Sequence, residues 1–380
     1  MAELNLQLRK LRDMSRELAG ELRAMAPAVD ADPADTALLR QSPALRFLRV
    51  VATPKQFRAY DVPAHAELFT ESCLGRVVSN IELARGDVSV LQTVAAPALA
   101  GFTVDALGNP AQQEWFYRDL AQNEPWTFFG MTEPRGGSDA TAMVTRLDPD
   151  PDGGFRLHGM KRYVANAHRG TIGVVWARTG SSSLSIRAVL VRRPMPGFAS
   201  TPLDMLGMRG ACIGEMTFDA VPVAREMLLG AHLPASRRGM WGANRAFTVV
   251  RLQIAAQALG AAFAVRDAVR DLRPGWSGHA LMSARLVAAR ELLYDAAVGA
   301  DRDPDDRVPV AVAKVHASEL AVETTRWAES VLAPGAFLDH PLLEKWCRDI
   351  YAYQFMDGTS NLLRLAIAPT AGTAATREEN

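Results

Sequence analysis

The chain has 380 residues, of which 48% are hydrophobic and 22% are charged, and 42 lysines and arginines balance 42 aspartates and glutamates. These globular values predict two or three domains, with enough apolar material to fold without a metal or a disulfide framework. A net charge of zero argues against a nucleic-acid-binding protein and against one that charge holds on a membrane surface. No stretch approaches the roughly 18 apolar residues that span a membrane, so we expect no membrane partner.

The N-terminal third of the chain has helical sequence patterns. Leucines recur between charged residues at helical spacing from Leu4 to Leu22, which is typical of an amphipathic helix. Further along, Ala, Leu, Glu and Gln are common, and Pro97 and Pro110 mark breaks. We therefore expect a helical domain over residues 1–126. Its expected helices are 4–25, 44–58 and 64–123.

Helical patterns stop near residue 127, where Gly, Pro and β-branched residues become common. Short runs with strand character follow, bounded by turn signals such as PDGG, GSSS and RRPMPG. Their regular spacing predicts a small β-barrel or sandwich over residues 127–235. The expected strands are 155–165, 172–179, 185–193 and 215–223.

From residue 236 the helical periodicity returns. One segment places Leu252, Ala256, Leu259 and Phe263 on a single stripe, which is typical of a helix packed on a core. We expect a helical bundle over residues 236–368 and a disordered tail over residues 369–380. The expected helices are 251–272, 280–299, 309–332 and 341–356.

The spacing of the cysteines and the charges near the N-terminus indicate the cellular compartment of the protein. Cys73, Cys212 and Cys347 are far apart and form no CxxC pair. This pattern argues against a disulfide framework and a zinc site built from thiolates, and it fits a reducing environment. The first residues carry charges and show no apolar segment of a secretory signal. We therefore expect a cytoplasmic protein.

Several familiar catalytic motifs are missing from the sequence. There is no GxGxxG after a strand, no GxxxxGK[ST], no HExxH and no GxSxG. A nicotinamide enzyme, a kinase, a metalloenzyme and a serine hydrolase therefore lose their usual support, and we expect no metal. Three glycine-containing stretches remain as candidates, namely GMTEPRGGSD (130–139), GMKRYVAN (159–166) and MDGTSN (356–361).

Each of the three stretches has a structural and a functional interpretation. The first favours a tight turn between domains, although its backbone donors and hydroxyls also suit an anion or a planar cofactor. The second favours a structural strand. In the third, Asp357 favours the N-cap of a final helix. Alternatively, Phe355 and Met356 limit the solvation of Asp357, which then acts as a base.

Taken together in this order, these stretches resemble motifs of the acyl-CoA dehydrogenase family of flavoproteins. GMTEPRGGSD resembles the family's TEPxAGSD signature, and GMKRYVANA resembles its GxKxWITNA strand. The terminal RDIYAYQFMDGTSNLLRLAIA resembles the RD…EGTS motif, and two further matches are LGMRGACIGEMTFDAVPVAREMLLG (206–230) and RLQIAAQALG. The resemblance covers roughly residues 60–368.

The resemblance implies a fold and a reaction. The fold is mainly α with a central β-barrel, which separates an N-terminal helical domain from a C-terminal four-helix bundle. FAD lies between the β-domain and the bundle, a proton leaves Cα of an acyl thioester, and hydride leaves Cβ for the flavin. The implied partners are a thioester on CoA or on an acyl carrier protein in specialised metabolism, an acceptor such as an electron-transfer flavoprotein, and further copies in a homodimer or homotetramer.

The resemblance also assigns site residues. Asp357 is the catalytic base, and the Gly358 amide contacts the thioester oxygen. Arg251 and Ser138 contact the substrate, Ser138 near its pantetheine arm, and Tyr163 covers the flavin. The residues expected to contact FAD are Met131, Thr132, Gly137, Ser138, Tyr163, Ala165, Arg273 and Thr359.

Departures from the family motifs leave other functions open. Asp357 replaces the usual Glu, and Ala165 replaces a Thr that bonds the flavin. Some relatives carry the base at another position, and Val250, which cannot ionise, occupies that position here. The loop that reaches FAD across the dimer is shortened to RDLRPGWSG (270–278), which contains Arg273. These changes keep open a flavin oxidase or monooxygenase that acts on a nitro, amino or hydroxy substrate. A flavin-binding subunit without turnover is a third interpretation.

Overall fold

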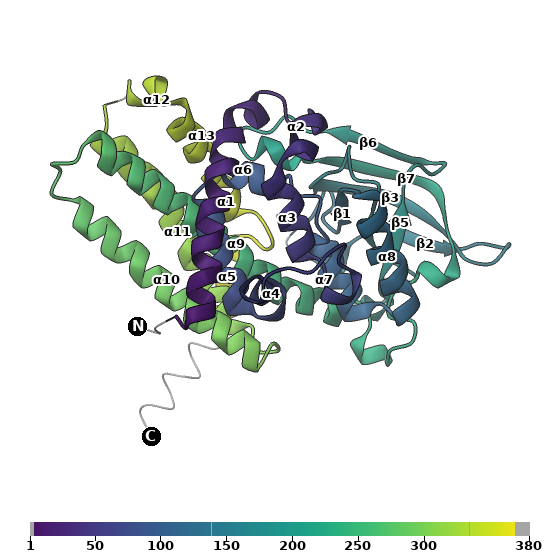
Figure 1. The fold of residues 1–380 in the computed structure, drawn as a ribbon. Helices are drawn as coiled ribbons and strands as arrows, with labels where there is room; N and C mark the ends of the chain where they lie inside the picture. The colour runs from purple at the N-terminus through teal and green to yellow at the C-terminus, as the bar shows by residue number, and fades with distance from the viewer. Residues whose placement is uncertain (1–3, 138, 334, 369–380) are drawn as a thin grey trace.

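The computed structural model describes residues 4–137, 139–333 and 335–368. Along the chain, helical segments precede and follow a curled mixed sheet. In Figure 1 the sheet lies on the right and helices α10 and α11 lie on the left, with α1 between them in the view. This arrangement confirms the predicted mainly helical fold with a central β-domain between two helical parts. The tail over residues 369–380 and Ser138 lie outside the described residues.

The N-terminal part consists of eight α-helices among the described residues. Side chains of Asn5, Ser42, Ser72, Asp87 and Asn109 accept hydrogen bonds from amides in the first turns of five of them, and such caps explain where these helices begin. The segment expected as helix over 64–123 divides into five helices. The bounds are α1 (Leu6–Ala31), α2 (Thr36–Gln41), α3 (Pro43–Ala52), α4 (Ala64–Glu71), α5 (Cys73–Ala84), α6 (Val88–Leu91), α7 (Ala98–Leu107) and α8 (Pro110–Asn123).

The central sheet has seven strands in the order β1-β4-β2-β3-β7-β6, and β5 pairs with β4. β1 and β4 are parallel, with Thr127 opposite Ile172, whereas β3 and β7 are antiparallel. The four expected strands are present, and three short strands, β1, β2 and β6, were missed. The bounds are β1 (Thr127–Gly130), β2 (Arg146–Pro149), β3 (Phe155–Val164), β4 (Ile172–Arg178), β5 (Ile186–Arg192), β6 (Phe198–Pro202) and β7 (Gly214–Val223).

The C-terminal part is built around one long helix, α9. It begins at Met240, well before the expected start at residue 251, and it packs against α5, α10 and α11. The expected helix over 341–356 ends at Ile350 and continues as a 3-10 helix, η7 (Tyr351–Gln354). The bounds are α9 (Met240–Leu272), α10 (His279–Arg302), α11 (Val308–Val331), α12 (Ala336–Asp339) and α13 (Pro341–Ile350), and a last helix covers 360–368.

Small residues on α9 join the N-terminal helices to the bundle in one core. A Cβ at Gly260 would lie 2.3 Å from the carbonyl oxygen of Ile81 in α5, so only glycine permits this approach. Ala255, Ala258 and Ala262 are fully buried in a cluster that draws residues from α1, α5, α10, α11 and α13. The helices that carry the terminal motif therefore rest on the N-terminal part.

Helix α9 also requires a correction to the sequence analysis. The segment Ala235–Leu272 contains an 18-residue window of mean hydropathy 1.4, which is long and apolar enough to cross a membrane. The expectation that no such stretch exists was therefore wrong. However, 83% of this window is buried inside the protein, as expected of a core helix that other helices surround.

Candidate active site

Asp357 lies in a tight turn between η7 and the last helix. Its φ is 52° and that of Gly358 is 103°, so two successive residues have left-handed backbone. Glycine tolerates this conformation without strain, whereas it is uncommon for aspartate. The turn thus interrupts the helical backbone between η7 and the last helix.

Thr359, and not Asp357, caps the last helix. The Thr359 Oγ1 accepts a hydrogen bond from the amide of Leu362 at 3.2 Å, and the Thr359 carbonyl accepts one from the amide of Leu363. This geometry is that of an N-cap. The interpretation of Asp357 as a helix cap was therefore wrong, and its carboxylate is available for another role.

Two cations from neighbouring helices hold the backbone of this turn. Arg251 of α9 donates from Nε to the carbonyl oxygen of Asp357 at 2.9 Å. Lys314 of α11 donates from Nζ to the carbonyls of Tyr353 and Gly358, both at 2.9 Å. None of these three hydrogen bonds involves the Asp357 carboxylate. Lys314 was not singled out from the sequence, because no motif linked it to the terminal stretch.

The surroundings of the turn raise the pKa of the Asp357 carboxylate. Burial raises the pKa of Asp357, although the charges of Arg251 and Lys314 oppose this shift. Burial also lowers the pKa of Lys314 to about 8, against the opposing effect of Asp357. A carboxylate whose pKa is raised binds an abstracted proton more tightly, which makes it a stronger general base near neutral pH.

The first glycine-containing stretch is fixed by a buried ion pair. Lys161 Nζ lies 2.9 Å from Glu133 Oε1 and 3.0 Å from the carbonyl oxygen of Met131. The other contacts of Glu133 are the amides of Val144 and Thr145, at 2.8 and 2.9 Å. Since the Glu133 carboxylate binds the end of the loop and its partner Lys161 binds the Met131 carbonyl at the start, the segment after β1 has a defined shape. Neither Glu133 nor Lys161 was predicted as functional, although both lie inside the motifs.

The residues expected around the flavin lie on this loop and at the end of β3. Met131 is buried, Thr132 is half-buried and Gly137 is exposed. The Thr132 carbonyl accepts a hydrogen bond from the amide of Arg162 at 2.8 Å. Tyr163 has a φ of 59° and is 58% exposed. Ala165 is exposed beside it.

Contacts link the end of β3 to the terminal motif. The amide of Asn166 donates to the carbonyl of Ala211 at 2.8 Å, and the amide of Met208 donates to Asp349 of α13 at 2.6 Å. Buried Lys345 contacts Asp349 at 2.7 Å, and it also binds Asp87 of the N-terminal part. The three parts of the chain therefore meet next to the segment that leads to Asp357.

The donor set fits a planar cofactor. A flavin needs an apolar face, backbone donors on its ring edge and an open approach for substrate. Tyr163 exposes an aromatic ring, and the hydroxyl of Ser360, next to Thr359, is buried and makes no hydrogen bond with any described residue. No group of three or more possible metal ligands occurs among the described residues.

One expected FAD contact does not lie near Asp357 within the chain. Arg273 is exposed at the C-terminal end of α9 and donates to the carbonyl of Val331. It lies on the order of 33 Å from Arg251 along the helix, at 1.5 Å per residue. Contact of Arg273 with the same cofactor as Asp357 would need a second subunit.

Two family models match most of the β-domain and most of the bundle. The middle domain of acyl-CoA dehydrogenases matches residues 128–221, and their C-terminal domain matches residues 277–371. The glutaryl-CoA dehydrogenase of Desulfococcus multivorans is 27% identical over 315 residues, which are 78% of this chain and 79% of that protein. The short-chain specific acyl-CoA dehydrogenase of Megasphaera elsdenii is 28% identical over 76% of this chain and 79% of that protein.

Solved structures share the same fold. PigA with FAD and proline has a TM-score of 0.85 at 18% identity, covering 98% of this chain and 99% of that one. The prolyl acyl carrier protein oxidase AnaB has a TM-score of 0.83 at 21% identity, covering 97% of this chain and 100% of that one. The chain belongs to the acyl-CoA dehydrogenase family, whose members are oxidoreductases.

Proposed function

We propose that this protein is an FAD-dependent oxidoreductase that forms a double bond between Cα and Cβ of an acyl thioester. The observation that supports this most strongly is the Asp357 turn. Its carboxylate has a raised pKa, and the two neighbouring cations bind the backbone instead of the carboxylate. Asp357 is therefore free to accept the Cα proton, and bound FAD supplies the acceptor for the Cβ hydride.

The amide of Gly358 is the proposed donor to the thioester oxygen. It makes no hydrogen bond with any described residue. The same peptide group contains the Asp357 carbonyl that Arg251 binds. Because N–H and C=O point in opposite directions in a trans peptide, Arg251 orients and polarises the Gly358 N–H. A fixed donor of this kind stabilises negative charge that develops on an oxygen.

The residues proposed to hold FAD come from the matched motifs. Met131, Thr132 and Gly137 belong to the loop after β1, Tyr163 lies near the end of β3 and Ala165 directly follows that strand. Thr359 follows Gly358, and Ser138 lies outside the described residues. The Glu133–Lys161 pair keeps the first of these segments in place. We propose that Arg273 contributes to this site from a neighbouring subunit, in a homodimer or homotetramer. We propose that the protein is located in the cytoplasm.

An oxidase that acts on a carrier-protein substrate is the second candidate. Asp357 is shorter than the usual Glu by one carbon–carbon bond, about 1.5 Å, which favours a substrate of different shape. The carrier-protein oxidase AnaB shares the fold over the whole chain. In this case oxygen would replace an electron-transfer flavoprotein as the acceptor.

The deciding experiment is anaerobic mixing of the purified FAD-loaded protein with acyl thioesters on CoA and on a carrier protein. Loss of flavin absorbance with either carrier supports the proposal and identifies the substrate class. Oxygen consumption in air then separates an oxidase from a dehydrogenase. A colourless protein that FAD cannot reconstitute would contradict the flavoprotein assignment.

A further inference from the structure

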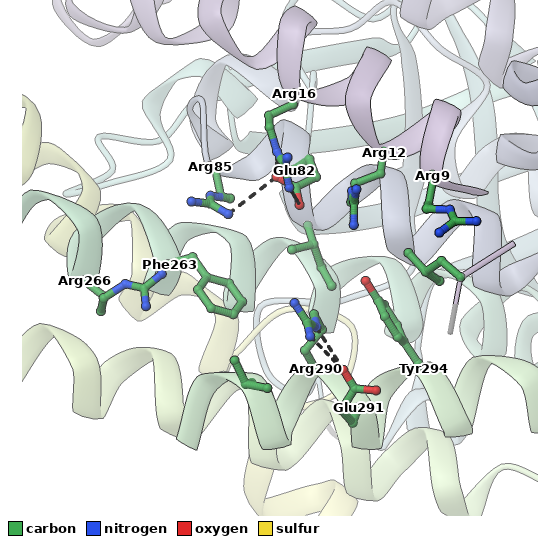
Figure 2. Close-up of a pocket in the computed structure, with 13 residues that line it drawn as sticks. Arg9, Arg12, Arg16, Glu82, Arg85, Phe263, Arg266, Arg290, Glu291 and Tyr294 are labelled. Atoms are coloured by element: carbon green, nitrogen blue, oxygen red, sulfur yellow. Dashed lines mark hydrogen bonds and ion pairs between the residues drawn. The ribbon is translucent and has the colours of Figure 1, made fainter. Parts of the chain in front are cut away.

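A pocket lies between α1, the end of α5, α9 and α10 (Figure 2). Its volume is about 610 Å³, and only two carboxylates, Glu82 and Glu291, line it. Six arginines line it beside those two glutamates, and two carboxylates just outside the lining offset part of their charge, because Asp13 pairs with Arg12 and Arg16 and Asp267 pairs with Arg85 and Arg266. The arginines are Arg9, Arg12, Arg16, Arg85, Arg266 and Arg290.

The arginines converge from α1, α9, α10 and the residue that follows α5. Arg9, Arg12 and Arg16 follow one another at three- and four-residue spacing on α1, so they share one face of that helix. Figure 2 shows Arg12 extending from α1 toward the space above Tyr294, with Arg290 rising from α10 on the opposite side. The cations therefore surround one volume instead of forming a flat basic surface.

Ion pairs at the edge hold some of these guanidinium groups in place. Arg16 binds Glu82 through Nε and Nη2, at 3.0 and 2.9 Å. Arg290 binds its neighbour Glu291 at 2.8 and 3.2 Å. A planar guanidinium that is already oriented loses less conformational entropy when it binds a further anion.

Like charges come close together at the apolar end of the pocket. Arg85 and Arg266 both lie over the ring of Phe263, at 5.5 and 5.3 Å from its centroid. Burial lowers the pKa of Arg266, Asp267 opposes this shift, and repulsion from Arg270 and Arg85 adds to it. Asp267 forms ion pairs with both guanidinium groups and offsets part of this repulsion, and a bound anion would offset more of it.

We propose that this pocket binds a small phosphate-bearing molecule of nucleotide size. Guanidinium groups match phosphate oxygens in a two-bond geometry and are favoured for phosphate recognition. The volume falls in the range of small-molecule sites, roughly 300–1,000 Å³. Ile81, Phe263, Val287 and Tyr294 add apolar walls for the organic part of the ligand.

The pocket is separate from the Asp357 turn. Phe263 follows Arg251 on α9, and the two residues are about 18 Å apart along the helix axis, at 1.5 Å per residue. None of the residues proposed to bind FAD or thioester lines the pocket. The inference therefore does not depend on the proposed function.

The test is calorimetric titration of the FAD-loaded full-length protein with inorganic pyrophosphate and with ADP, at constant ionic strength. We expect one pyrophosphate per chain, and tighter binding of ADP because its organic part meets the apolar walls. The double variant Arg12→Gln/Arg290→Gln should weaken binding by about tenfold or more, the effect of losing hydrogen bonds to a charged group. Val287→Trp should weaken binding without changing the charge, because the larger ring fills the pocket.

Arg118→Gln is the matched control. Arg118 lies on α8, is exposed and pairs with Glu114, so its replacement removes one positive charge, half of what the double variant removes, and leaves the pocket intact. Affinity should stay within about twofold of the unchanged protein. Absence of pyrophosphate and ADP binding would overturn the proposal. Equal binding by the unchanged protein and the Val287→Trp and Arg12→Gln/Arg290→Gln variants would overturn it as well.

Discussion

Arg251 donates to the backbone oxygen of Asp357 at 2.9 Å and leaves its carboxylate without a hydrogen bond from this cation. A direct ion pair would hold the carboxylate as a weak base with a low pKa. The observed contact fixes the position of Asp357 while its pKa stays raised by burial. Arg251 therefore fixes the position of the base through its backbone and does not form an ion pair with its carboxylate.

Replacement of Asp357 tests its role as the base. Asp357→Asn keeps the size of the side chain but cannot accept a proton, so flavin reduction by substrate should slow by about 100- to 10,000-fold. Folding and FAD absorbance should be unchanged, because Thr359 provides the helix cap. Stopped-flow absorbance under anaerobic conditions measures the rate.

Asp357→Glu is the companion variant. It restores the side-chain length usual in the family, so an ordinary acyl thioester should be tolerated and a bulkier substrate should react more slowly. Flavin reduction at the unchanged rate in Asp357→Asn would show that another group takes the proton.

Arg251→Gln should affect both the rate and its pH dependence. The positive charge of Arg251 lowers the pKa of Asp357, so its removal should raise that pKa. Because the deprotonated form accepts the proton, the acidic limb of the kcat profile should move to higher pH. Loss of the contact to the Asp357 carbonyl should also lower kcat more than it changes KM, because the Gly358 N–H loses its orientation.

Arg245→Gln is the control for Arg251→Gln. Arg245 lies earlier on α9 and pairs with exposed Asp305 at 3.4 Å, so it removes a similar charge away from the turn. An unshifted acidic limb in Arg251→Gln would rule out the electrostatic link between Arg251 and Asp357.

The buried lysine Lys314 should make stability depend on alkaline pH. Its pKa is about 8 in the folded protein, below the value of roughly 10.4 in an unfolded chain. Between these two values the unfolded chain binds more protons, so Lys314 contributes stability that rises with pH. Urea unfolding at pH 7.5 and 9.5 measures this rise.

Lys314→Met should reduce the rise in stability between these pH values. At pH 7.5 the variant should also lose about 1–3 kcal/mol for each carbonyl that loses its donor, those of Tyr353 and Gly358. The same pH dependence in Lys314→Met as in the unchanged protein would contradict the assignment to Lys314.

Glu133→Gln should loosen the loop that carries the proposed FAD contacts. The substitution leaves Lys161 buried without its countercharge, which typically costs about 3–5 kcal/mol. We expect faster FAD release, seen as recovery of flavin fluorescence on dilution. Glu114→Gln, an exposed carboxylate on α8, is the control, and equal FAD release in both variants would exclude a special role for the Glu133–Lys161 pair.

The sequence predicted elements whose residues show a pattern by themselves. The leucines of α1 and the small and apolar residues of α9 define helices at any position in a fold, and β3 and β7 are long enough to show their character. β1 and β2 have only four residues each, too few to show a period. The strand conformation of β1 depends on pairing with β4, a partner distant in the sequence, whereas β2 pairs along its four residues with the adjacent β3.

The amino-acid sequence by itself determined the order of helical, β and helical parts and the motifs that place Asp357 and Gly358 in a terminal turn. Only the tertiary structure decided what Asp357 can do there. The residue types around Asp357 favoured it as a helix cap, whereas in the structure Thr359 caps the last helix. Arg251 and Lys314 reach the turn from α9 and α11, far away in the chain, and burial by such distant elements sets the pKa of a carboxylate.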